Sequence, residues 1–343
     1  MRQLTCVSPG SIEWREVPAP RLEGEGEALV RPLAVARCDI DRPLAAGVLP
    51  LRGPFALGHE CVAEVAALGD GVRGLAPGDL VVVSFQVSCG ACARCRAGRT
   101  ALCEKLPTLS DYGMQPLSGV EWGGMLSDCL RVPFAEAMLQ RIPAGVDPVE
   151  LASVSDNATD GWRAVAPHLA AQPAREILIV SHGLPSIPLY AVQTAYALGA
   201  RRVDFASDDA DSLAHAEKLG ARPLETDFAK PPRTWPIVVD AGLRPEGFAF
   251  AVRATEPEGV LQSVSFYPGR TIELPMTRAY TLGLRFSIGR CHAAAQIPRV
   301  LELVAAGRLR PGAVTTRVVD WEEAPRAWLE PAAKLVVRRS ARE

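Results

Sequence analysis

Short apolar runs, broken by glycine and proline, characterise the first half of the chain. The runs read EALVRPLAV, ECVAEVAAL, DLVVVSFQV and SDCLRVP, and turn sequences such as RGLAPGD separate them. Apolar runs of this length between turn-forming residues predict β-strands. We therefore expect a twisted, partly antiparallel β domain in this half.

The pattern changes at about residue 157. Apolar runs of strand length, EILIVS, RRVDFAS, PIVVDAG and GVLQSVSF, alternate with helical stretches such as YAVQTAYALGA and SLAHAEKLGA. This alternation predicts βα units around a parallel sheet. After about residue 292, AQIPRVLELVAAGRL predicts an amphipathic helix, and AVTTRVVDW and AKLVVRR predict strands that return to the first domain. We expect a first domain over 1–156, a parallel-sheet domain over 157–292, and a return to the first domain over 293–343.

Composition and charge narrow the class of protein. A chain of 343 residues is long enough for two domains with a core each. The formal charge of −2 argues against a general affinity for nucleic acid or for anionic membrane surfaces. The first residues form no signal-peptide core, and no stretch approaches the roughly 18 apolar residues of a membrane span. We predict a cytoplasmic protein that binds a small molecule.

A cluster of cysteines carries the clearest chemical signal. The segment CGACARCRAGRTALC contains Cys89, Cys92, Cys95 and Cys103. Four thiolates at this spacing can surround one Zn²⁺ ion as a tetrahedron, which leaves no open coordination position. The alternatives are free surface thiols or an iron–sulfur site. We predict a structural zinc site that folds an excursion too short and polar to have its own core.

Two further segments supply single metal-binding side chains. ARCDID contains Cys38, and LGHEC contains His59. Taken alone, a cysteine or a histidine is more often an ordinary core residue. Together they form an incomplete zinc site. Both segments precede the four-cysteine segment, and the βα region follows that segment. This order favours the interpretation of Cys38 and His59 as ligands.

These elements resemble the zinc-dependent medium-chain alcohol dehydrogenases over nearly the whole chain. The matching elements are CDID, GHE, GVRGLAPGDLVVV, the four-cysteine segment, GGMLSDCLRVP and the βαβ segment that ends in EKLGA. The resemblance implies an α/β fold in which a GroES-like β domain is interrupted by a Rossmann coenzyme-binding domain. It also implies a homodimer or homotetramer, and an oxidoreductase that transfers hydride between a nicotinamide cofactor and a small alcohol or carbonyl substrate.

The resemblance also implies a third ligand for a catalytic zinc ion. Relatives carry Cys, Asp or Glu shortly before a helix, and SVSDNATDGWRAV places Asp156 there, as in the formaldehyde-dehydrogenase branch. Cys38, His59 and Asp156 would then hold zinc with one position open for substrate. Glu60 is either an alternate ligand or a partner behind the ligands, and Asp41 can fix the tautomer of His59. The alternative role for Asp156 is a helix N-cap.

The proton relay of the family is missing. Ile40 stands where relatives usually carry Ser or Thr, and Pro43 stands where some relatives place a histidine. Neither side chain has a proton to relay. A water chain or another residue such as Asp39 then takes the substrate proton, or proton release is not part of the reaction.

The segment EILIVSHGLPSIPLYAVQTAYALGA has the strand, turn and helix of a dinucleotide site. Gly183 serves the tight turn, and Ser186 and Ile187 are candidate cofactor contacts at the start of the helix. Pro185 and Pro188 stand in the other two glycine positions of the motif. Because proline has no N–H to offer a pyrophosphate, we expect weakened cofactor binding.

The next strand ends in VDFASDDADS, which places Ser207 and Asp208 where the adenosine ribose would lie. A carboxylate favours the 2′-hydroxyl of NAD and repels the 2′-phosphate of NADP, so we expect NAD rather than NADP. The alternative is that these aspartates form only a solvated turn.

The unusual loop leaves a second function open. The prolines, Ile40 and Ser207 are compatible with a zinc Lewis-acid enzyme on the same scaffold, without productive nicotinamide binding. Such an enzyme would catalyse hydration, elimination or hydrolysis. A third class, a sensor without catalysis, would require Glu60 to fill the open zinc position.

Overall fold

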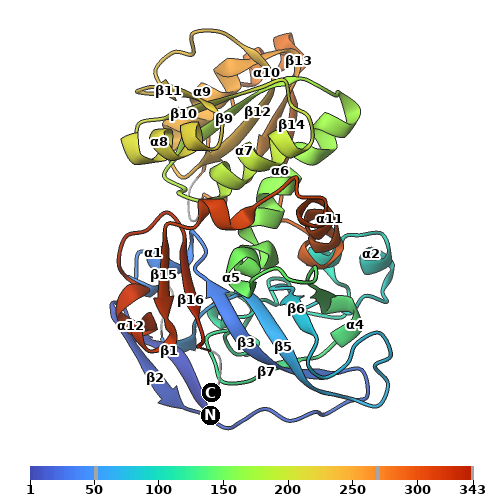
Figure 1. Cartoon of the computed structure of the whole chain (residues 1–343). Helices are drawn as coiled ribbons and strands as arrows, with labels where there is room; N and C mark the ends of the chain where they lie inside the picture. Colours follow the sequence, from blue (N-terminus) through green and yellow to red (C-terminus); the bar gives the residue numbers. More distant parts are fainter. Residues whose placement is uncertain (50–52, 268–270, 341–343) are drawn as a thin grey trace. The chain divides into compact units, whose positions relative to one another are not determined.

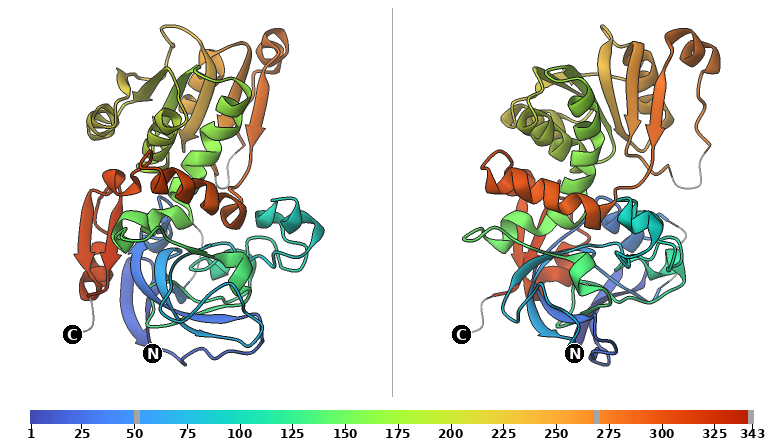
Figure 2. Two further views of the ribbon diagram at one scale, coloured as in Figure 1. Left: turned by 45° about the vertical axis from the view of Figure 1, so that its right-hand side comes forward. Right: turned by 90° about the vertical axis from the view of Figure 1, so that its right-hand side faces the viewer.

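The computed structural model describes residues 1–49, 53–267 and 271–340, and Figures 1 and 2 show the course of the chain. The chain forms two compact units. Met1–Thr159 and Cys291–Glu343 form the first unit, and Asp160–Arg290 form the second.

A mainly antiparallel sheet is the frame of the first unit. Its strand order is β15-β16-β3-β5-β6-β8, and β7 also pairs with β3. The bounds are β3 (Ala28–Ala36), β5 (Glu60–Leu68), β6 (Leu80–Val83), β7 (Leu130–Val132), β8 (Leu139–Arg141), β15 (Arg317–Asp320) and β16 (Leu335–Arg338). Val336 of β16 pairs with Ala36 of β3, and Figure 2 shows this C-terminal ribbon beside the N-terminal strands. Segments from both ends of the chain therefore build one sheet.

A small sheet and short helices complete the first unit. The small sheet has the order β2-β1-β4, formed by β1 (Arg2–Ser8), β2 (Ser11–Glu16) and β4 (Phe55–Ala56). The helices are α1 (Asp41–Ala45), α2 (Ala93–Arg96), η1 (Thr100–Leu102), α3 (Gln115–Ser118), α4 (Ala135–Met138), α5 (Pro148–Leu151), η2 (Ala152–Ser155), α11 (Ala293–Ala305), η3 (Pro311–Val314), η4 (Trp321–Glu323) and α12 (Ala324–Ala327). In α11, Ile297, Val300 and Leu301 are buried, which is the helical spacing of the predicted amphipathic segment.

The second unit contains a parallel sheet of the order β11-β10-β9-β12-β13-β14. Its strands are β9 (Glu176–His182), β10 (Arg202–Ser207), β11 (Arg222–Glu225), β12 (Trp235–Gly242), β13 (Thr255–Ser263) and β14 (Arg285–Ile288). Counted from β9, the order is 3-2-1-4-5-6, the doubly wound arrangement of a dinucleotide-binding fold. Buried apolar side chains run continuously along β9, as parallel strands covered on both faces require.

Helices connect the strands of this sheet. They are α6 (Asn157–Ala171), which enters the unit from the first, α7 (Ile187–Ala197), α8 (Ala210–Lys218), α9 (Pro245–Ala254) and α10 (Met276–Leu282). Right-handed connections place α7 and α8 on one face of the sheet and α9 on the other, and Figure 1 shows α7 and α8 in front of the strands. The strand order reverses between β9 and β12, and the crevice at their carboxyl ends is the usual ligand position in such sheets.

One edge of the parallel sheet is notably exposed. All four residues of β14 are exposed, and every residue of α10 is at least partly exposed. The large apolar side chains there include Met276, Tyr280, Phe286 and Ile288, with exposed fractions of 67%, 87%, 38% and 58%. A hydrophobic strand edge of this kind can pair with another chain.

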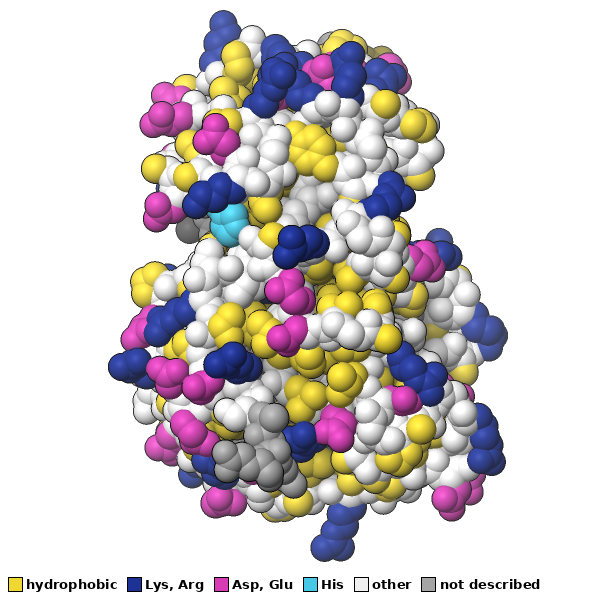
Figure 3. Space-filling model, viewed as in Figure 1, with side chains coloured by type: hydrophobic (Ala, Val, Ile, Leu, Met, Phe, Trp, Pro, Cys, Tyr) yellow, Lys and Arg dark blue, Asp and Glu magenta, His cyan; other side chains and the backbone are white. Residues whose placement is uncertain are grey.

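Two surface properties bear on possible partners. Over the described residues, none of the helices combines the length and the apolar character needed to cross a bilayer. On the face of the first unit drawn in Figure 3, side chains of both charges are interspersed, in keeping with the small net charge.

Candidate active site

Three separate segments of the first unit bring four metal-binding side chains together. Cys38 follows β3, His59 and Glu60 stand at the start of β5, and Asp156 lies between η2 and α6. Their ligand atoms all lie within 4.8 Å of one another. The structure thus brings together the four residues that the sequence analysis grouped.

Local backbone features hold these segments in place. Gly58 has a φ of +87°, a conformation that favours glycine, and it sets the chain direction directly before His59. The amide of Cys61 in β5 donates to the Ser155 hydroxyl at 2.9 Å, which joins β5 to η2. Because Asp156 follows Ser155, this hydrogen bond holds its carboxylate opposite His59.

Carboxylates lie beside both ring nitrogens of His59. Asp41 Oδ1 lies 3.2 Å from His59 Nδ1, and Asp156 Oδ2 lies 3.4 Å from His59 Nε2. The thiol of Cys38 donates to Asp156 Oδ2 at 3.2 Å. A carboxylate at the far nitrogen fixes the tautomer of a metal-binding histidine, as expected for Asp41.

Burial and neighbouring charges shift the ionisation of this cluster. Burial raises the pKa of the Cys38 thiol well above its ordinary value, and the Asp156 carboxylate adds to the effect. Burial disfavours a charged His59, but Asp41 and Cys38 outweigh it, so the pKa of His59 is raised well above its ordinary value. Burial also disfavours the Asp156 carboxylate, yet contacts with His59 and Cys38 lower its pKa. A divalent cation would take the place of the protons held here.

The donor set fits zinc. His59 Nε2 is buried and makes no hydrogen bond among the described residues, although the Asp156 carboxylate lies 3.4 Å from it. A buried ring nitrogen beside a thiol and a carboxylate offers the nitrogen, sulfur and oxygen ligands that zinc takes in proteins. Cys38, His59 and Asp156 would hold the ion, and Glu60 is the remaining donor within reach.

The four cysteines of the second cluster also meet. Cys89, Cys92, Cys95 and Cys103 have their sulfur atoms within 4.8 Å of one another. Cys92 is the N-cap of α2, and Cys103 follows η1, so two short helical turns fold the segment around the sulfurs. Figure 2 shows these turns in an excursion from the sheet.

Backbone amides point at the sulfur atoms of this cluster. The amides of Cys95 and Glu104 donate to Cys92 Sγ at 3.4 and 3.5 Å. These hydrogen bonds, from Glu104 and Cys95, lower the pKa of Cys92 to about 6. Stabilised thiolate in a closed set of four sulfurs suits a structural zinc ion.

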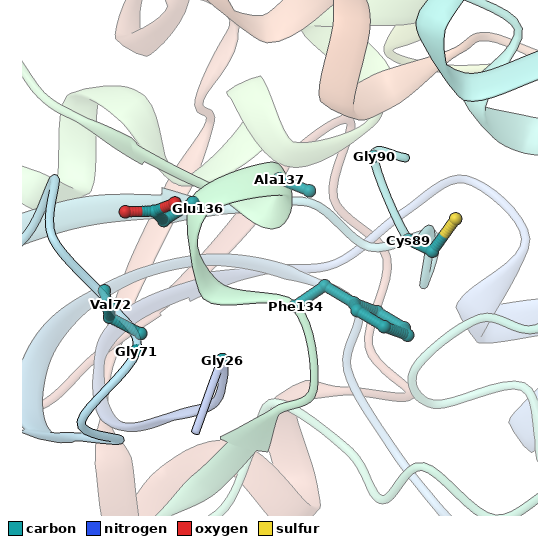
Figure 4. A pocket seen from close by; sticks show the side chains of 8 residues that line it. All are labelled: Gly26, Gly71, Val72, Cys89, Gly90, Phe134, Glu136 and Ala137. Carbon is teal, nitrogen blue, oxygen red and sulfur yellow. The ribbon is translucent and has the colours of Figure 1, made fainter. Parts of the chain in front are cut away.

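A pocket of about 380 Å³ in the first unit is separate from the four-ligand cluster at Cys38. Figure 4 shows its lining residues, which are Gly26, Gly71, Val72, Cys89, Gly90, Phe134, Glu136 and Ala137. The carboxylate of Glu136 already accepts the amides of Arg73 and Gly74, at 2.8 and 2.9 Å. Its polar group is thus used in holding a loop. Because Cys89 also belongs to the four-cysteine cluster, the pocket lies beside that cluster and not at Cys38.

In the second unit, the predicted cofactor residues lie at the carboxyl ends of neighbouring strands. Gly183 follows β9 with a φ of +107°, Ser186 is the N-cap of α7, and Ile187 is the first residue of that helix. Ser207 ends β10, and Asp208 follows it. They lie on the sheet edge where a dinucleotide binds in this topology.

A cluster of polar side chains surrounds Asp208. Its carboxylate lies 3.5 Å from His182 Nε2 and 3.7 Å from Arg244 Nη1. Burial lowers the pKa of His182, and the neutral ring can accept a hydrogen bond from Arg244 Nη1 at 3.1 Å. The sequence analysis singled out Asp208 but not Arg244, which reaches this edge from the segment after β12.

Comparisons with known proteins agree with this architecture. Residues 24–144 match the alcohol dehydrogenase GroES-like domain family. The probable zinc-binding alcohol dehydrogenase Rv1895 of Mycobacterium tuberculosis is 26% identical over 341 residues, which are 97% of this chain and 86% of that protein. The solved structure of alcohol dehydrogenase TADH from Thermus sp. ATN1 is 27% identical, with a TM-score of 0.90, and the match covers 99% of this chain and 100% of that one.

The medium chain reductase/dehydrogenase ucsI of Acremonium sp is 32% identical over 231 residues, which are 66% of this chain and 76% of that protein. The chain belongs to the zinc-dependent medium-chain alcohol dehydrogenase family. The predicted combination of a GroES-like domain and a Rossmann domain is confirmed. The protein is a zinc-dependent oxidoreductase.

The sequence analysis of this dehydrogenase missed three residues beside the ligand cluster. Asn157 donates to Cys38 Sγ and to Asp156 Oδ2, both at 3.1 Å. Lys334 lies next to Glu60, and the Cys291 thiol lies 3.7 Å from Asp156 Oδ1. The only sequence signal for Lys334 was a lysine directly before an apolar strand, which is also common at protein surfaces.

Proposed function

We propose that this oxidoreductase transfers hydride between a nicotinamide cofactor and a small alcohol, aldehyde or ketone, with Cys38, His59 and Asp156 as ligands of a catalytic zinc ion. The Cys38 thiol, the His59 imidazole and the Asp156 carboxylate meet at one buried place. Among the described residues, His59 Nε2 makes no hydrogen bond there. These observations carry the proposal. Cys89, Cys92, Cys95 and Cys103 would hold a second, structural zinc ion.

The residues of the site have separate tasks in this proposal. When bound, zinc would polarise the substrate oxygen and the nicotinamide would accept or give the hydride. Asp41 keeps His59 in one tautomer, and the complete burial of His59 excludes water from that ligand. Ile40 and Pro43 cannot carry the substrate proton, so it leaves by another residue or by water. The formaldehyde-dehydrogenase branch stays a prediction, based on Asp156 as the third ligand.

Elemental analysis together with an assay of hydride transfer tests the proposal. We expect two equivalents of zinc per chain, one for each cluster, and reduction of NAD by small alcohols. A single equivalent held by the four cysteines would overturn it. Turnover of a substrate without any nicotinamide would favour the Lewis-acid alternative, which the names of the relatives do not favour.

We infer NAD rather than NADP as the preferred cofactor. Ser207 and Asp208 stand at the expected position of the adenosine ribose, and the carboxylate would repel a 2′-phosphate. Arg244 is close enough to Asp208 to offset part of this repulsion. Fluorescence titration should give a dissociation constant about tenfold lower for NADH than for NADPH, and Asp208→Ala should reduce that ratio. Tighter binding of NADPH would refute the inference.

We propose a homodimer that forms through the edge of β14, with a homotetramer as the alternative. The exposed strand and the apolar side chains of Phe286 and Ile288 support this partner, since two copies of one edge can pair about a twofold axis. Ile288→Lys should shift the mass measured by light scattering from two chains to one. A single-chain mass for the unaltered protein would contradict the proposal.

We also propose domain limits of 1–156, 157–292 and 293–343, supported by the grouping of contacts into two units near these positions. A cytoplasmic location stays a prediction.

A further inference from the structure

A buried ion pair lies directly behind the ligand cluster of the first unit. Lys334, just before β16, has a completely buried side chain. Its Nζ lies 2.9 Å from Glu60 Oε1 and 2.7 Å from Glu60 Oε2. Both oxygens of the carboxylate are therefore turned toward the lysine.

Asn157 joins this ion pair to the candidate zinc ligands. Its side-chain oxygen accepts from Lys334 Nζ at 2.6 Å, and its amide nitrogen donates to Cys38 Sγ and Asp156 Oδ2, both at 3.1 Å. The lysine is thus one side chain away from two of the ligands. The Thr316 amide donates to the Lys334 carbonyl at 3.0 Å, and the Lys334 amide donates to the Thr316 hydroxyl at 3.2 Å, which holds the lysine segment against the chain before β15.

A count of charges shows why the lysine matters. A divalent zinc ion balances the Cys38 thiolate and the Asp156 carboxylate, while His59 is neutral as a ligand. Glu60 adds one negative charge in a fully buried position, and Lys334 supplies the matching positive charge. Removing one member of a buried ion pair leaves the other uncompensated, which is strongly unfavourable.

Without the lysine, the proposed zinc ion would be a cation within reach of Glu60. The Glu60 carboxylate already lies within 4.8 Å of the other three ligand atoms. A shift toward the ion would complete a tetrahedron and remove the open position that a substrate oxygen needs.

We propose that Lys334 is a positioning residue that holds Glu60 away from the fourth coordination position. This inference rests on the proposed function, because it assumes a catalytic zinc ion at Cys38, His59 and Asp156. It assigns Glu60 to the support of the site, rather than to the ligand set.

Cobalt(II) in place of zinc at the Cys38 cluster, with imidazole as a probe of the open position, tests the inference. Visible absorption of the cobalt reports the ligand set, and its change on adding imidazole reports access to the fourth position. For Lys334→Met, we expect an altered cobalt spectrum before imidazole is added and an imidazole dissociation constant raised about tenfold or more. Lys334→Arg keeps the charge and is expected to retain access for imidazole.

The double variant Lys334→Met/Glu60→Gln is the decisive control. It removes the carboxylate together with the lysine, so imidazole binding should return to within about threefold of the unaltered enzyme. Imidazole binding by Lys334→Met at the unaltered affinity would overturn the inference, as would a failure of the double variant to recover. If the unaltered enzyme takes up no cobalt at this cluster, the proposed function fails as well.

If Lys334→Met does not fold, Glu60→Gln alone decides the matter. The inference expects its cobalt spectrum and its cobalt content to match those of the unaltered enzyme. Loss of cobalt or a changed spectrum in Glu60→Gln would show that Glu60 is already a ligand, which contradicts the inference.

Discussion

The two cysteine-containing clusters differ in how their members are brought together. Cys89 to Cys103 are neighbours in sequence, and two short turns with backbone amides are enough to gather their sulfur atoms. Cys38 and Asp156 are 118 residues apart, and they meet only because β3, β5 and η2 pack together. A locally encoded cluster can form almost by itself, whereas the distant one depends on the whole fold of its unit.

Because of this difference, we expect the loss of one cluster to affect stability and the loss of the other to affect catalysis. The four-cysteine segment has no apolar core of its own apart from its sulfur atoms and the partly buried Phe134, so its metal would contribute mainly to stability. The distant cluster lies among fully buried residues of the larger sheet, so its loss should affect chemistry more than folding.

The largest effect is expected for His59→Ala. If His59 is a zinc ligand, as proposed, its loss should lower kcat by about 10³-fold or more and remove one of two metal equivalents, because the remaining ligands would no longer hold the ion in place. Steady-state kinetics and elemental analysis measure both. His215→Ala, in α8 of the second unit, is the control. Two equivalents retained by His59→Ala would exclude His59 as a ligand.

Cys95→Ser should act in the opposite manner. We expect a loss of about 3 kcal/mol in the free energy of unfolding, since the segment would lose the metal ion proposed to fold it. The kcat of the folded fraction should stay within about threefold of the unaltered value. Denaturant unfolding and kinetics check this, with the partly buried Cys129→Ser, outside both clusters, as the control. Abolished turnover at unchanged stability would contradict the separation of roles.

Asp41→Asn tests the support behind His59. Removing the carboxylate that fixes the tautomer should weaken zinc binding at this cluster by about 10- to 100-fold. Competition with a chelator measures the affinity, and the second metal equivalent should not change. Asp39→Asn, in the same segment, should leave the affinity unaltered. Equal effects of the two substitutions would mean that Asp41 acts only through the local charge.

Cys291→Ala is expected to have the smallest effect. The Cys291 thiol lies 3.7 Å from Asp156 Oδ1 but is outside the group of four ligand atoms. Metal content should stay at two equivalents, and kcat should change by no more than about threefold. Cys38→Ala is the matched variant, and it should lose one equivalent. A lost equivalent in Cys291→Ala would place a second thiolate in the distant cluster.

The two clusters also differ in how well the sequence predicts them. The spacing of the four cysteines predicts their cluster directly, because it is a spacing typical of zinc sites. Cys38, His59 and Asp156 could be grouped only through the family resemblance, since single residues on separate segments carry no spacing signal. Alternating strand and helix patterns predict the parallel sheet, and its strand order agrees.

The sequence did not predict residues that reach a site from a distant segment of the chain. Arg244 approaches Asp208 from the chain after β12, and nothing in either local pattern indicates the other. Lys334 pairs with Glu60 across 274 residues, and a pattern of apolar and polar positions favours an exposed lysine at a strand start. Such contacts depend on the packing of elements, which periodicity alone does not specify.

The position of Lys334 along the chain has a consequence for biosynthesis. A ribosome makes Glu60 well before it makes Lys334, and strand β3 waits equally long for its neighbour β16. During that interval the Glu60 carboxylate lacks its partner Lys334. The centre is therefore completed only after Lys334 has been synthesised and β16 has paired with β3.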